Sequence, residues 1–111
     1  LLEKGADRNV SNKDGKTPLI VASNKGHTDA AKLLLEKGVD PNICDEDGDT
    51  PLIDASSKGH TDVTILLLKK GADPNITNKD GETPLYIACS KGHSNVAELL
   101  LEKAADPNIF D

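Results

Sequence analysis

The segment from Asp14 to Asn42, DGKTPLIVASNKGHTDAAKLLLEKGVDPN, decides the fold of this 111-residue chain. Its first dipeptide, Asp14-Gly15, is typical of a tight turn, because Gly adopts positive φ without steric cost. Thr17 followed by Pro18 predicts a helix start, since the hydroxyl accepts a hydrogen bond from a free amide and Pro lacks an N–H that would be unbonded there. We therefore expect a turn that leads directly into a helix.

The rest of this segment predicts two short helices. The first runs to about Lys25 and ends at Gly26, and the second begins near His27 or Thr28 and stops at Gly38. Each helix has only about eight to ten residues, fewer than the roughly 12–15 that an isolated helix needs for marginal stability. The helices must therefore be stabilised by packing against neighbouring units.

The same pattern recurs every 33 residues, in full periods 1–33, 34–66 and 67–99, and residues 100–111 begin a fourth. The shared positions are Asp14-Gly15, Asp47-Gly48 and Asp80-Gly81; Thr17-Pro18-Leu19 with its counterparts at 50–52 and 83–85; and Lys25-Gly26-His27 with its counterparts at 58–60 and 91–93. One helix position holds Ala22, Ala55 and Ala88, whose small side chains permit close helix contact. The chain is therefore a repeat array.

The motif D-G-x-T-P-L-x-x-A, followed by K-G-H and L-L-L-x-K-G-A-D-x-N, resembles the ankyrin repeat family over the whole chain. The resemblance implies an all-α solenoid of stacked antiparallel helix pairs, with short β-hairpin loops between units and a concave surface that binds proteins. One departure is consistent. The family usually has His after Thr-Pro-Leu, whereas this chain has Ile20, Ile53 and Tyr86. The fold does not depend on that His, because an apolar residue can pack at the same position instead.

We expect complete helix pairs at about 17–37, 50–70 and 83–103, within one array segment that covers residues 1–111. Residues 1–4 resemble the last turn of a preceding helix, so partial units lie at both ends. No terminal unit has the polar outer face of a capping repeat. We therefore expect a segment of a longer array, monomeric apart from end-to-end contacts of uncapped repeats.

Composition and charge exclude several other classes of function. The chain has no Trp or Met and only one Phe and one Tyr, which fits thin Leu/Ala layers rather than one large core. A net charge of −6 argues against a nucleic-acid partner, and no apolar run approaches the roughly 20 residues of a membrane span. Because no charged segment followed by an apolar run begins the sequence shown, we also expect no signal peptide in it.

The two cysteines suggest neither a disulfide framework nor a zinc site. Cys44 and Cys89 align with Ser or Thr in the other repeats, so we expect small, partly buried thiols. They fit a reducing compartment and hence an intracellular location, cytoplasmic or nuclear.

Neither the histidines nor the acidic loop predicts a cofactor. His27, His60 and His93 recur at the repeat spacing, so we expect each ring to bond backbone at a turn between helices rather than to act in catalysis. No nucleophile and base constellation exists beyond the repeat, and the chain is expected not to be an enzyme.

A calcium loop is the other candidate. Asp45, Asp47 and Asp49 occupy positions 1, 3 and 5 of a calcium-binding loop, but its Gly and Glu positions hold Thr50 and Ser56. We therefore expect no metal.

Charge distinguishes the repeats from one another. Residues 1–33 carry a net charge of +2, residues 34–66 carry −6, and residues 67–99 carry zero. The extra acids of the middle repeat are Asp45, Glu46, Asp49 and Asp54, and the last of these aligns with Val21 and Ile87. An unpaired carboxylate is costly to desolvate, so Asp54 is the hardest of them to explain by solubility alone.

We interpret Glu46, Asp49 and Asp54 as an acidic patch on the concave surface, which would attract a partner with a basic segment. The candidate partner-binding residues are Lys13, Lys16, Asn24, Glu46, Asp49, Asp54, Ser57, Lys79, Glu82, Tyr86 and Ser90. Tyr86 is either an interface anchor or merely the residue at the family's His position, and the acids of the loops either bind or only solubilise.

The sequence therefore predicts a non-enzymatic protein-binding module. Two alternatives remain open: a structural spacer in a longer array, and the repeat segment of a larger enzyme or channel.

Overall fold

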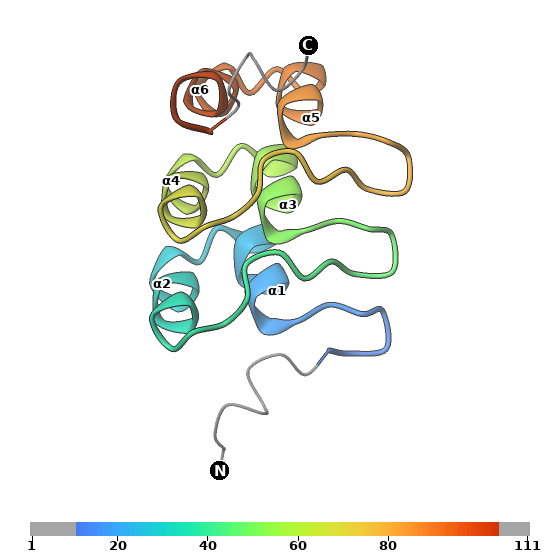
Figure 1. Ribbon diagram of the computed structural model, residues 1–111, viewed down its shortest axis with the longest axis vertical. Helices are drawn as coiled ribbons and strands as arrows, with labels where there is room; N and C mark the ends of the chain where they lie inside the picture. Colours follow the sequence, from blue (N-terminus) through green and yellow to red (C-terminus); the bar gives the residue numbers. More distant parts are fainter. Residues whose placement is uncertain (1–10, 105–111) are drawn as a thin grey trace.

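The computed structural model describes the backbone of residues 11–104 and the side chains of residues 11–102. This range contains six α-helices in three pairs: α1 (Pro18–Lys25) with α2 (Thr28–Glu36), α3 (Pro51–Lys58) with α4 (Thr61–Lys69), and α5 (Pro84–Ser90) with α6 (Ser94–Leu99). Figure 1 shows the pairs stacked in three tiers, with α1, α3 and α5 in one column and α2, α4 and α6 in another. The all-helical stack confirms the predicted fold class. The partial units expected at residues 1–4 and 105–111 lie outside the described residues.

The first helix of each pair begins as the sequence predicts. The hydroxyls of Thr17, Thr50 and Thr83 accept hydrogen bonds from backbone amides three residues later, at 3.1–3.3 Å, and Pro follows each Thr. Gly26 and Gly59 end α1 and α3 with φ of +74°, a conformation that side chains other than Gly rarely adopt. The local signals of the sequence therefore set these helix boundaries.

The third pair departs from an ordinary helix at its end. The sequence predicts helix as far as about residue 103, but α6 stops at Leu99 and a π-helical turn, η2 (Leu100–Ala104), follows it. The wider turn begins at Leu100, which is fully buried.

The loops that precede α1, α3 and α5 project to one side of the stack (Figure 1). Each is closed by a backbone hydrogen bond across its base, such as Asn12 N–H to Lys16 O at 3.0 Å and Asp45 N–H to Asp49 O at 3.0 Å. Residues 11–104 contain no β-strand, so the predicted hairpins are hydrogen-bonded turns here. The turns are too short to form a ladder of paired backbone groups.

The core is one continuous set of thin layers between tiers. Its fully buried residues are Leu19, Ala31, Leu52, Ala55, Leu67, Ala88 and Leu100. Ile20 and Ile53, at the positions where the family usually has His, are 0% and 1% exposed, whereas Tyr86 is 59% exposed. Apolar packing therefore replaces the polar contact in two of the three repeats.

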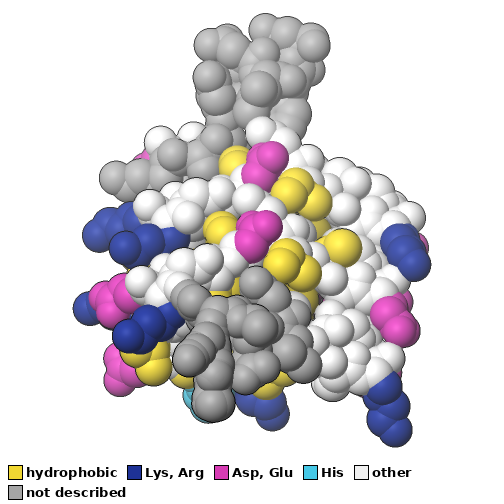
Figure 2. Space-filling view, turned by 60° about the horizontal axis from the view of Figure 1, so that its bottom comes forward, with side chains coloured by type: hydrophobic (Ala, Val, Ile, Leu, Met, Phe, Trp, Pro, Cys, Tyr) yellow, Lys and Arg dark blue, Asp and Glu magenta, His cyan; other side chains and the backbone are white. Residues whose placement is uncertain are grey.

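On the outer surface, Figure 2 shows hydrophobic and acidic side chains along the centre of one face, with Lys side chains on both sides of it. None of the helices in the described part of the chain is long and apolar enough to cross a membrane.

Replacing Ser56 with Ala should raise the free energy of unfolding by about 1 kcal/mol, because Ser56 is fully buried and its Oγ has no hydrogen-bond partner among the described residues. Urea denaturation followed by circular dichroism measures the change. Ser57→Ala, at the half-buried neighbouring position, is the control and should gain only the helix-propensity difference of about 0.5 kcal/mol. A loss of stability on Ser56→Ala would show that the hydroxyl is satisfied.

Candidate functional site

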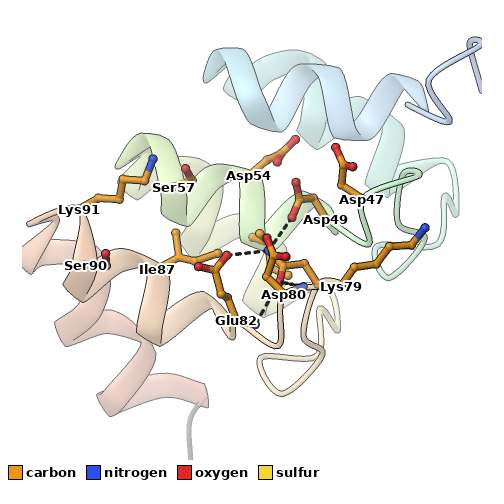
Figure 3. A pocket seen from close by; sticks show the side chains of 12 residues that line it. Asp47, Asp49, Asp54, Ser57, Lys79, Asp80, Glu82, Ile87, Ser90 and Lys91 are labelled. Carbon is orange, nitrogen blue, oxygen red and sulfur yellow. Dashed lines mark hydrogen bonds between the residues drawn. The ribbon is translucent and has the colours of Figure 1, made fainter.

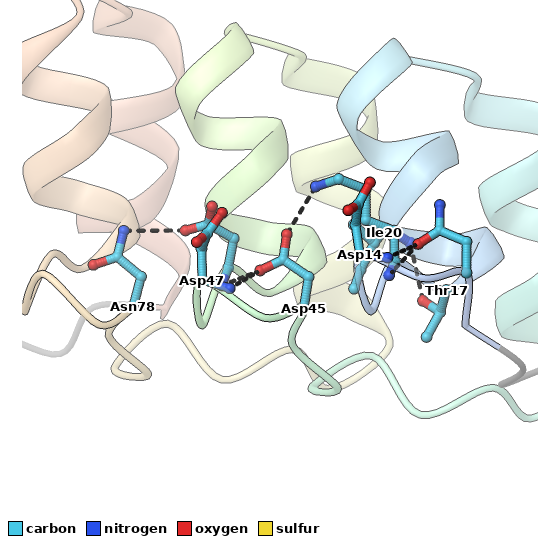
Figure 4. A network of polar contacts seen from close by, with 9 residues as sticks. Asp14, Thr17, Ile20, Asp45, Asp47 and Asn78 are labelled. Atoms are coloured by element: carbon cyan, nitrogen blue, oxygen red, sulfur yellow. Dashed lines mark hydrogen bonds and ion pairs between the residues drawn. The ribbon is translucent and has the colours of Figure 1, made fainter.

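One position in each loop holds a side chain that organises the turn. The Oδ1 atoms of Asn12, Asp45 and Asn78 each accept hydrogen bonds from the backbone amides two and four residues later, at 2.9–3.0 Å. Figure 4 shows this arrangement for the middle repeat. Asp45, one of the four extra acids of that repeat, therefore stabilises the turn of its own loop through these hydrogen bonds.

The other oxygen of Asp45 joins two repeats. Lys16 Nζ lies 2.8 Å from Asp45 Oδ2, and the Asp45 side chain is only 1% exposed. Burial opposes ionisation of Asp45, but the hydrogen bonds from Lys16 and from the amides of Asp49 and Asp47 hold its pKa below the ordinary value. The hydrogen bond to Asp45 also raises the pKa of Lys16. Lys16, a candidate partner-binding residue, is thus engaged within the fold.

These contacts bear on the calcium interpretation. Single carboxylate oxygens of Asp45, Asp47 and Asp49 lie within 4.8 Å of one another. Both oxygens of Asp45, however, already accept hydrogen bonds from the backbone and from Lys16. The closeness of the three acids is therefore explained by the turn itself.

A pocket of about 280 Å³ lies between α3, α5 and the loops that precede them. We call it the acidic pocket. Five of its lining residues are acidic and two are lysines (Figure 3); the complete lining is Asp47, Asp49, Ile53, Asp54, Ser57, Asn78, Lys79, Asp80, Glu82, Ile87, Ser90 and Lys91. The pocket therefore combines a negative wall with the aliphatic side chains of two isoleucines.

Asn78 connects two of these acids across the repeat boundary. Its Nδ2 donates to Asp49 Oδ1 at 3.0 Å and to Glu82 Oε1 at 2.9 Å. Burial nevertheless raises the pKa of Asp49, and the nearby charges of Asp45 and Asp47 act in the same direction. Asn78 therefore fixes the positions of the Asp49 and Glu82 carboxylates, while burial and the neighbouring negative charges oppose ionisation of Asp49.

Asp54, in the first turn of α3, is the most strongly perturbed acid of the site. It is only 6% exposed, and its Oδ2 is buried with no hydrogen-bond partner among the residues that the structure describes. Burial first, and the charge of Asp49 second, raise the pKa of Asp54 to about 6, although Lys16 and Asn24 act in the opposite direction. A carboxylate has replaced the Val or Ile of the flanking repeats without gaining a full set of partners.

The structure brings together about half of the predicted site residues. The acidic pocket contains Asp49, Asp54, Ser57, Lys79, Glu82 and Ser90; its lining excludes Lys13, Lys16, Asn24, Glu46 and Tyr86. The predicted patch of Glu46, Asp49 and Asp54 is divided accordingly, since Glu46 is exposed and its amide bonds to Asp14 O at 3.3 Å.

Sequence reasoning missed the other lining residues of the pocket: Asp47, Ile53, Asn78, Asp80, Ile87 and Lys91. Asp47 and Asp80 belong to the Asp-Gly turn that every repeat shares. Because the turn alone accounts for these residues, the sequence contains no additional sign that they lie beside a pocket. A residue that is needed for the turn can still present its carboxylate to a ligand.

The histidine prediction is confirmed for two repeats. His60 Nε2 lies 2.9 Å from Asn24 O, and His93 Nε2 lies 3.0 Å from Ser57 O, so each ring bonds the backbone of the preceding repeat. These imidazoles join repeats.

The prediction of partly buried thiols is wrong, because Cys44 and Cys89 are both exposed. Ser23 and Ser56, which align with Cys89, are fully buried. Cys89 differs because it lies on α5, over which no helix of a further repeat packs within the described range.

Comparison with known families supports the repeat assignment. A family model for ankyrin repeats in three copies matches residues 1–78, and a model for ankyrin repeats in many copies matches residues 67–111. No curated protein matches the chain.

Proposed function

Because the chain belongs to the ankyrin-repeat family, whose repeats are generally protein–protein interaction modules, we propose that it is a non-enzymatic module that binds a protein partner with a basic segment. The partner would lie on the concave surface formed by the projecting loops and by α1, α3 and α5. We also propose an intracellular location, cytoplasmic or nuclear, because both exposed cysteines are free thiols.

The acidic pocket is the observation that carries the basic-partner proposal. Five carboxyl groups and two ammonium groups line one pocket, and the pKa values of two of the carboxyls, Asp49 and Asp54, are raised. A cation placed there would relieve a repulsion that the fold leaves uncompensated.

A structural spacer is the second candidate, and the pattern at one helix position argues against it. A spacer needs only apolar packing at the position of Asp54, as Val21 and Ile87 provide in the flanking repeats. The buried acid therefore favours a binding role over a spacer.

Peptides selected by phage display on the immobilised chain should be enriched in Lys and Arg. Replacing Glu46 with Gln together with Asp49 with Asn should weaken the selected peptides about tenfold, because the favourable field at the loops is reduced. Isothermal titration calorimetry at several salt concentrations measures the affinity and its salt dependence.

The matched control neutralises exposed acids on the second helices, Glu36→Gln with Asp62→Asn, and should leave peptide affinity unchanged. Selection of peptides with no excess of basic residues would refute the basic-partner proposal. Equal affinity for the two double variants would refute it as well.

A further inference from the structure

The acidic pocket contains one charge that the fold does not need. Asp54 is more than nine-tenths buried, and its Oδ2 has no hydrogen-bond partner within the described structure. A buried carboxylate in that condition lowers stability unless something compensates it. A cationic ligand that donates hydrogen bonds would supply both the donor and the positive charge that this carboxylate lacks.

The surroundings of Asp54 indicate which kind of cation would fit. Asp49 borders the same pocket, and Ile53 and Ile87 add apolar wall to it. Figure 3 shows Lys79 and Lys91 on opposite sides of the view, with the carboxylates of Asp49 and Asp54 between them. The pocket thus offers acceptors beside aliphatic surface, which suits a long side chain with a charged end.

We propose that the acidic pocket binds one arginine side chain of the partner, with its guanidinium at Asp49 and Asp54 and its methylene groups against Ile87. The proposal rests on the proposed function, because it specifies which chemical group of a protein partner enters the site. The volume of about 280 Å³ is ample for one such side chain.

Arginine fits the site better than lysine for two physical reasons. Its planar guanidinium carries five N–H donors in a fixed fork, which lets one group engage two carboxylates at once. It is also less strongly hydrated than an ammonium group, so transfer to a half-enclosed site costs less.

Binding should also be linked to pH, because a cation favours the ionised form of Asp54. Within the described structure the charged groups near this carboxyl are Asp49, Asp45 and Lys16, and the pocket adds Asp47, Asp80, Glu82, Lys79 and Lys91. With the pKa of Asp54 at about 6 in the free protein, arginine binding releases a proton below that pH. Affinity should therefore be about tenfold higher at pH 7 than at pH 5.

The direct test uses methylguanidinium chloride and the carbon-13 carboxyl signals of the full chain. We expect a saturable shift at Asp54 and Asp49 and a lowered pKa of Asp54. Sodium chloride and tetramethylammonium chloride at equal ionic strength should give no saturable shift, because neither donates hydrogen bonds. Equal responses to all three salts would overturn the proposal.

Two variants extend this test. Asp54→Asn should abolish the saturable response, since the amide carries no charge, while Glu98→Gln, an exposed change on α6, should leave it intact. A response that persists in Asp54→Asn would overturn the assignment of the site.

A peptide experiment separates this proposal from the proposed function. In a selected basic peptide, Arg→Lys at the anchoring position should weaken binding about tenfold to the wild-type chain, and much less to Asp54→Asn. If basic peptides bind both chains equally and methylguanidinium gives no saturable shift, the arginine pocket is wrong and the basic-partner proposal stands. If methylguanidinium binds at Asp54 but the selected peptides are not basic, the proposed function is wrong and the pocket stands.

Discussion

Replacing Gly59 with Ala will lower the free energy of unfolding by about 3 kcal/mol. Gly59 has φ of +74°, and a Cβ at this position would lie 2.7 Å from Nδ1 of His93. The ring cannot move away freely, because its Nε2 is bonded to Ser57 O at 3.0 Å. The added methyl group must therefore disturb the contact between the second and third repeats.

The third repeat provides a matched control. Gly92 has nearly the same φ, +77°, but no described atom lies within 4 Å of a Cβ placed there. Gly92→Ala should therefore lose only the backbone cost of about 1–2 kcal/mol. Urea denaturation of both variants measures the difference. Equal losses would mean that backbone conformation alone, and not contact with the histidine, requires glycine at these positions.

Replacing Asp54 with Val will raise the free energy of unfolding by about 2–3 kcal/mol at pH 7. The pKa of Asp54 is about 6, roughly two units above that of an unfolded Asp, and each unit corresponds to about 1.4 kcal/mol. Val already occupies this helix position in the first repeat, at Val21. The fold should therefore accommodate a valine side chain at position 54 without a loss of packing.

The gain should depend on pH with a definite sign. The folded chain holds the Asp54 proton more tightly than the unfolded chain, so the wild-type protein loses stability as pH rises from about 4 to about 6. Asp54→Val lacks this loss, and its advantage over wild type should grow across that window and stay constant above it.

Denaturation of both chains at pH 4, 5, 6 and 7 measures this dependence, and Glu98→Gln controls for the general effect of removing an exposed charge. An advantage of Asp54→Val that does not change with pH would contradict the raised pKa.

Gly59→Ala and Asp54→Val are expected to change the stability of the repeat stack in opposite directions. Gly59 is required because the repeats stack closely, and its loss weakens the stack. Asp54 weakens the stack as it stands, and its loss should strengthen the fold while removing the proposed arginine site. A variant that is more stable and binds less well is the pattern expected of a functional residue.

The sequence alone determined the repeat, the helix starts and the first-helix ends, because the signals for these features are local. Thr50 caps α3 within its own first turn, and Gly59 ends the same helix through its own φ. The tertiary structure decided which of the acidic side chains have hydrogen-bond or ion-pair partners. Lys16 reaches Asp45, 29 residues away, and Asn78 reaches Asp49 at the same separation, whereas the repeat period is 33.

Aligning the repeats therefore places these partners in different columns, so the alignment does not show which acid Lys16 or Asn78 reaches. Whether a carboxylate is neutralised depends on which side chains the stacking of successive loops brings within reach of it. That is a property of the contact between repeats, and it is the reason the sequence singled out Asp54 as an unusual acid while only the folded stack showed Asp45 to be paired and Asp54 Oδ2 to have no partner among the described residues.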